Sequence, residues 1–121
     1  SCLAMGFRVQ ARDEAAAERL IEEAKLLEAA GCFALVVECI PSALGAKVAA
    51  ALSIPVIGIG AGAETDGQIL VWQDLLGLNQ NRLAKFVRRF GNLGEAAQTA
   101  LNQYADAVGE GSYPAPAEAY E

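Results

Sequence analysis

The sequence predicts an α/β protein with a small parallel sheet, and three observations support this. Segments with apolar residues at every third or fourth position alternate with short, nearly unbroken apolar runs. Such runs are typical of strands that are buried on both faces of a sheet. A chain of 121 residues, 54% of them hydrophobic, is long and apolar enough for one folded domain at most.

The first expected elements are a strand near residues 3–9 and a long helix over 13–30. Gly6 weakens the strand pattern, whereas Asp13 suits the positive N-terminal end of the helix. The apolar positions of this helix recur at helical spacing and comprise Ala17, Leu20, Ile21, Ala24 and Leu27.

Three more strands and one helix are expected in the middle of the chain. The run at 32–40 is the second strand, and Pro41 favours the start of a helix over 42–52. The third strand is expected near 54–60 and the fourth near 68–72, with a glycine-rich loop between them.

Two helices and a tail are expected to complete the chain. Helices over 81–90 and 93–108 follow the fourth strand, and residues 109–121 form an extended or loosely ordered tail. The expected inward faces of the two helices comprise Leu83, Phe86, Val87 and Phe90 in the first, and Ala97, Leu101, Tyr104 and Val108 in the second.

Alternating strands and helices imply that the four strands are parallel. Two architectures fit residues 1–108: a small open sheet, or half of an eight-stranded (β/α)₈ barrel, which needs about 250 residues. Composition does not choose between them.

Charge and composition exclude several functions. The net charge of −6 argues against a duplex nucleic-acid binder, and no apolar run approaches the length of a membrane helix. The absence of histidine removes Ser-His-Asp and Cys-His mechanisms, so acid–base chemistry falls to carboxylates, lysine, tyrosine or thiols.

The three cysteines suggest a reducing compartment. Cys2, Cys32 and Cys39 have no metal-binding spacing, and the last two, at the ends of one strand, would lie roughly 23 Å apart. Free thiols and a cytoplasmic location are therefore expected.

Glu38 is the most informative residue, because it ends an apolar run just before a turn into a helix. Strand alternation places it on one face with Val36 and Ile40. Ligands of α/β proteins bind at the carboxyl ends of strands, and a glutamate placed there in apolar surroundings is a candidate general base. The alternative is a structural glutamate that pairs with an arginine or caps the next helix.

Other polar and glycine-rich segments carry weaker signals. Gly58–Gly62 has GxGxG spacing, which favours a tight turn at a strand's mouth over a dinucleotide site. Asp66 and Asp74 suit turns or caps better than a metal. One expected helical face carries three basic residues, Arg82, Lys85 and Arg89. They form a solvated surface, or they meet an anionic ligand tail or an acidic partner.

Four motifs carry a resemblance to a known family: Phe7–Gln10, Leu35–Pro41, Ile54–Gly62 and Asp66–Val71. In their order and with near-family gaps between them, they resemble one enzyme family, ketopantoate hydroxymethyltransferase. The resemblance covers nearly the whole chain and places it on the C-terminal half of the family's (β/α)₈ barrel.

The resemblance implies an activity and a division of residues. The family transfers a hydroxymethyl group from 5,10-methylenetetrahydrofolate to 3-methyl-2-oxobutanoate, uses Mg²⁺ and forms homo-oligomers. Glu38 matches the family's catalytic base, and the substrate pocket is expected to include Ile59, Gly60, Ile69 and Val71. The metal ligands belong to the other half of the family's barrel, so no metal site is expected here.

Some positions depart from the family pattern. Gln73 replaces a usual histidine, Met5-Gly6 replaces a double glycine, and the tail lacks the histidine found near the family's end. The isolated chain is expected to be inactive, with its barrel completed by an N-terminal half or by association. The alternatives are a non-catalytic, self-associating half-barrel and a small nucleotide-binding module.

Overall fold

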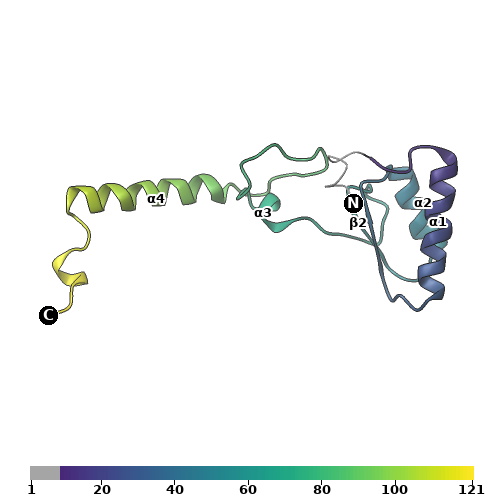
Figure 1. Ribbon diagram of the computed structural model, residues 1–121, viewed down its shortest axis with the longest axis horizontal. Helices are drawn as coiled ribbons and strands as arrows, with labels where there is room; N and C mark the ends of the chain where they lie inside the picture. Colours follow the sequence, from purple (N-terminus) through teal and green to yellow (C-terminus); the bar gives the residue numbers. More distant parts are fainter. Residues whose placement is uncertain (1–8) are drawn as a thin grey trace. The chain divides into compact units, whose positions relative to one another are not determined.

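The structure, a computed structural model, describes residues 9–121 (Figure 1). The strand expected near 3–9 therefore lies outside the described residues, except for Val9, which belongs to no regular element. The chain forms two compact units, of which the first includes residues up to 70 and 84–87 and the second includes 71–83 and 88–121.

A parallel sheet of three strands organises the first unit. The strands β1 (Leu35–Glu38), β2 (Val56–Ile59) and β3 (Gly67–Gln68) lie in the order β1-β2-β3. Both neighbouring pairs are parallel. The predicted α/β class with parallel strands is thus confirmed.

Two helices cover one face of this sheet. They are α1 (Glu14–Ala29) and α2 (Ser42–Ala51), close to the expected 13–30 and 42–52 (Figure 1). Asp13 caps α1, since its Oδ1 accepts a hydrogen bond of 2.8 Å from the amide of Ala16. The core between helices and sheet comprises Ala24, Val37, Ile40, Leu44, Val48, Val56 and Ala61.

The other face of the sheet carries large apolar side chains that remain accessible. Val36 on β1 is 57% exposed, and Ile69, just after β3, is 49% exposed. Single exposed apolar residues are ordinary, but several on one sheet face indicate a surface that packs against something else.

Glu28 in the last turn of α1 ties this helix to the start of β2. Its Oε1 accepts hydrogen bonds from the hydroxyl and amide of Ser53, at 2.6 and 2.7 Å, and from the amide of Ile54, at 3.1 Å. The hydroxyl of Ser53 contributes most to holding the pKa of Glu28 below its ordinary value of 4.5, followed by the Ser53 amide.

We expect Glu28→Gln to destabilise the first unit at neutral pH and to flatten its acid unfolding. A lowered pKa in the folded state means that ionised Glu28 stabilises the fold at pH values above its unfolded pKa. This contribution is lost as the pH falls through the lowered value. Urea midpoints measured between pH 2 and 7 would show the two proteins converging in acid. Parallel curves would contradict the assignment.

The helix expected over 81–90 is wrong. The segment 81–90 contains only a turn, in which the amide of Val87 bonds to the carbonyl of Ala84. Tertiary contacts override the helical pattern: Phe86 packs against Gly60 in the first unit, whereas the amide of Phe90 bonds to Leu75 in the second. Phe90, expected to face inward, is 67% exposed.

The fourth strand is much shorter than the expected 68–72. Only Gly67–Gln68 is strand, although the amide of Ile69 still bonds to the carbonyl of Gly58. Val71 caps a short helix, α3 (Trp72–Leu75), by accepting from the amides of Asp74 and Leu75. The apolar pattern concealed this change because a short helix leaves no periodicity to detect.

The last helix, α4, spans Leu93–Glu110, close to the expected 93–108. No residue of α4 is buried, so the predicted inward face is wrong: Leu101, Tyr104 and Val108 are exposed. The tail begins after Gly111. Its Tyr113 ring lies edge-on to the Tyr104 ring of α4, with 5.6 Å between the ring centres. A short 3₁₀ helix, η1 (Pro116–Glu118), follows.

The expectation of free thiols holds for only one of the two described cysteines. Cys32 is free, whereas Cys39 forms a disulfide. No helix in the part of the chain that the structure describes combines the length and apolar character of a membrane-crossing segment.

Candidate active site

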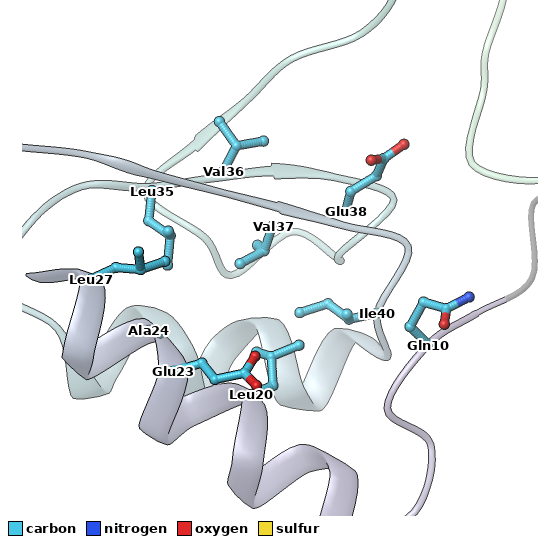
Figure 2. A pocket seen from close by; sticks show the side chains of 10 residues that line it. All are labelled: Gln10, Leu20, Glu23, Ala24, Leu27, Leu35, Val36, Val37, Glu38 and Ile40. Atoms are coloured by element: carbon cyan, nitrogen blue, oxygen red, sulfur yellow. The ribbon is translucent and has the colours of Figure 1, made fainter. Parts of the chain in front are cut away.

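Glu38 lies at the carboxyl end of β1, as the sequence predicts. Its side chain points to the same side as that of Val36, away from α1 and α2 (Figure 2). Ile40 does not share this side: it is buried in the core with Val37. The reason is Cys39, whose φ of 51° interrupts the strand and reverses the alternation.

A groove runs along β1. It encloses about 310 Å³ and is lined by both faces of the strand, by α1 and by Gln10 (Figure 2). Apolar side chains such as Leu20, Leu27 and Val36 make up much of the wall, with Glu38 at one end.

The Glu38 carboxylate is exposed, and among residues 9–121 no side chain or amide donates a hydrogen bond to it. The structural role weighed above, pairing with an arginine or capping α2, is therefore not what the described residues show. A carboxylate without a partner beside apolar side chains is available to take a proton from a bound molecule.

Two predicted pocket residues lie in a row with Glu38. In the sheet register Glu38 pairs with Ile59, so their side chains share one face. Ile69 follows Gln68, which pairs with Gly58, and therefore continues the row on β3. The structure thus brings Glu38, Ile59 and Ile69 together, whereas Val71 belongs to the second unit.

The glycines after β2 serve close packing. Gly60 and Gly62 have positive φ values of 65° and 84°, and a Cβ on Gly60 would lie 2.6 Å from the Phe86 ring. A bend and loop, not a helix, follow Gly60, so the helix N-terminus that a dinucleotide fingerprint requires is missing at this point of the described chain. The nucleotide-binding alternative loses its basis.

We expect Gly62→Ala to destabilise the first unit by about 1–3 kcal/mol. The new Cβ would need a left-handed backbone and would press on the Cα of Ser42, 2.8 Å away. Gly109→Ala is the control, because Gly109 has open space in α4, where alanine improves helix propensity. Urea unfolding of both variants tests this, and equal midpoints would contradict it.

Asp66 and Asp74 have structural roles. Oδ2 of Asp66 accepts from the amide of Val56 at 2.8 Å, and Oδ1 of Asp74 accepts from the side-chain amide of Asn79 at 2.8 Å. Within the described residues, no group of three or more histidines, cysteines, aspartates and glutamates is arranged to hold a metal ion.

The basic residues that were expected to share a helical face separate, because their segment is not a helix. Arg89 donates to the carbonyl of Asn79 at 2.6 Å, and Arg88 lies 5.5 Å from the centre of the Phe90 ring. Lys85 lines a second cavity.

Fold and site together define a class: an α/β protein whose candidate ligand site lies at the carboxyl ends of parallel strands. Residues 2–116 match the family described as ketopantoate hydroxymethyltransferase. The chain belongs to this family, and the resemblance drawn from the four motifs is confirmed.

Relatives named 3-methyl-2-oxobutanoate hydroxymethyltransferase give the same result. The chain is 51% identical to one from Clostridium botulinum over 109 residues, which cover 90% of the chain and 40% of that protein. It is 52% identical to one from Parabacteroides distasonis over 114 residues (94% of the chain, 42% of that protein). For Thermobifida fusca the identity is 48% over 115 residues (95% and 41%). The chain thus spans about two fifths of these relatives.

Proposed function

We propose that this chain is the C-terminal half, which carries the catalytic general base, of an enzyme that makes 2-dehydropantoate for pantothenate biosynthesis. The enzyme would transfer a one-carbon unit from 5,10-methylenetetrahydrofolate to 3-methyl-2-oxobutanoate, with water supplying the new hydroxyl. The family match over residues 2–116 and the names of the relatives support this assignment.

The proposed architecture is half of a (β/α)₈ barrel. In such a barrel helices cover the outside of the parallel strands, while the inner face packs against the remaining strands. The first unit has this asymmetry, since α1 and α2 cover one face and Val36 and Ile69 are exposed on the other. An N-terminal half, or further copies of the chain, would cover the exposed face.

Glu38 is the proposed general base. A proton on C3 of the oxo acid is acidified by the neighbouring keto group, and its removal leaves an enolate whose C3 attacks the one-carbon donor. The carboxylate of Glu38 takes this proton. The observation that carries the proposal is the position of Glu38: it ends a strand, faces the open side of the sheet and has no partner among the described residues.

The apolar neighbours of Glu38 would hold the branched end of the oxo acid. Ile59 and Ile69 share its row on the sheet, and Gly60 follows with a left-handed turn. Val71 is assigned to the same pocket from the family resemblance alone.

Mg²⁺ is part of the proposal, but the described residues do not fit it. A magnesium site needs oxygen ligands that converge, and no such cluster lies in residues 9–121. We assign the metal ligands to an N-terminal half of the enzyme.

A cytoplasmic location is proposed from the biosynthetic role. Folate and oxo-acid substrates are small metabolites of that compartment, and the free thiol of Cys32 suits it. The Cys39 disulfide is the observation against it.

The test is an assay of the chain together with an N-terminal half from a relative. We expect the purified complex to convert 3-methyl-2-oxobutanoate and 5,10-methylenetetrahydrofolate into 2-dehydropantoate, measured by mass spectrometry. An assembled complex that forms none of this product would support the alternative, a self-associating half-barrel without catalysis. The exposed apolar residues of the sheet face favour this alternative.

A further inference from the structure

A second cavity, of about 350 Å³, lies at the carboxyl ends of β1 and β2 and does not include Glu38. Its wall comes from the turn after β1, the start of α2, the loop after β2 and the segment 84–86. All of these belong to the first compact unit, so the cavity is formed within one body.

Lys85 gives this cavity its charge. It is the only ionisable side chain among the cavity's described lining residues apart from the disulfide-bonded Cys39. Within residues 9–121 no carboxylate or carbonyl pairs with its ammonium group. A lysine ammonium carries three donors and binds anionic oxygens as a point charge.

The rest of the cavity suits a partly aromatic ligand. Phe86 is held in place because its ring packs directly on Gly60, where any Cβ would collide with it. The hydroxyl of Ser42, at the start of α2, is a further donor on the wall. A cation, a hydroxyl and an aromatic ring in one cavity recognise a carboxylate attached to a flat, apolar body.

We propose that this cavity binds a substrate carboxylate through Lys85, and that the carboxylate is the glutamate tail of the folate donor. This inference rests on the proposed function. Both substrates carry carboxylates, but in the oxo acid the carboxylate is only two bonds from the carbon that reacts at Glu38. The cavity adjoins the Glu38 groove, because Ile40 lines both and Cys39, on its wall, follows Glu38 in the chain. Of the two substrates, only the folate donor carries its carboxylates on a flat aromatic body, which suits the Phe86 ring beside Lys85.

The test uses the complete enzyme, this chain with its N-terminal half, and compares Lys85→Met with the unchanged protein. Calorimetry measures the Kd of tetrahydrofolate and of tetrahydropteroate, which lacks the glutamate. We expect Lys85→Met to weaken tetrahydrofolate binding about 10–100-fold, as for a lost charge-assisted hydrogen bond. Tetrahydropteroate should bind both proteins equally, because the partner of Lys85 is already absent.

Arg82→Met is the matched control, because it removes a positive charge nearby in the sequence from a residue that does not line the cavity. It should leave both Kd values within twofold. Equal Kd values of tetrahydrofolate for Lys85→Met and the unchanged protein would overturn the inference.

Two further outcomes distinguish the oxo acid from the folate donor as the source of the carboxylate, and the proposed function from the proposed role of Lys85. A higher KM for 3-methyl-2-oxobutanoate alone in Lys85→Met would place the oxo acid at Lys85 and overturn the choice of folate. Failure of the proposed function would instead appear in the unchanged protein, as an absence of 2-dehydropantoate. Product formation with unaltered folate binding in Lys85→Met would refute only the present inference.

Discussion

Replacing Glu38 by glutamine should slow deuterium exchange at C3 of 3-methyl-2-oxobutanoate by about 10²–10⁴-fold in the completed enzyme. Glutamine keeps the size and polarity of the side chain but cannot accept the proton at neutral pH. Exchange is followed by proton NMR without the folate donor, so it reports proton removal separately from carbon–carbon bond formation.

Glu23→Gln is the matched control for this experiment. Glu23 lines the same groove from α1, on the side of the strand opposite to Glu38 (Figure 2). The Glu23→Gln variant should catalyse deuterium exchange at a rate within about twofold of the unchanged protein, since the Glu23 carboxylate is not placed to take the proton from C3. An unaltered rate in Glu38→Gln would remove Glu38 from the mechanism, and slowing in both variants would indicate a general effect of groove charge.

The second large effect is expected from leaving the N-terminal half out. The chain alone should form no detectable 2-dehydropantoate, because its described residues hold no metal-binding cluster and Val36, on the same sheet face as Glu38, is exposed. Adding the N-terminal half should restore product formation. Turnover by the purified 121-residue chain alone would contradict this prediction.

Light scattering adds a check that does not depend on activity. A sheet face with exposed apolar side chains should associate, and Val36→Asp should reduce this association by placing a charge on that face. A monodisperse monomer of the unchanged chain would count against the half-barrel. The expected inactivity would then need another cause.

The elements of the first unit follow from the sequence because their signals are local. The apolar stripe of α1, its cap at Asp13 and the apolar run of β1 act within a few residues, and their pattern carries into the structure. Glu38 is predictable for the same reason, since a charged residue that ends an apolar run is visible without any knowledge of distant contacts.

The misplaced elements depend on contacts that no local pattern contains. The segment 81–90 has helical spacing, but its Phe86 packs on Gly60 and its Phe90 amide bonds to Leu75, so two separate units divide it. The stripe of α4 is amphipathic, yet none of the residues of this helix is buried. Lys85 was recognised only as one of several basic residues, because nothing in its sequence neighbours marks a cavity.

The tie between Glu28 and the start of β2 lies at the end of the sheet opposite to Glu38. In (β/α)₈ barrels, residues at the amino ends of the strands contribute to stability, and those at the carboxyl ends form the active site. Substitutions around Ser53 should therefore change the thermal stability of the protein without changing the turnover of the completed enzyme. Efforts to raise thermal stability should begin there, far from the residues that contact the substrates.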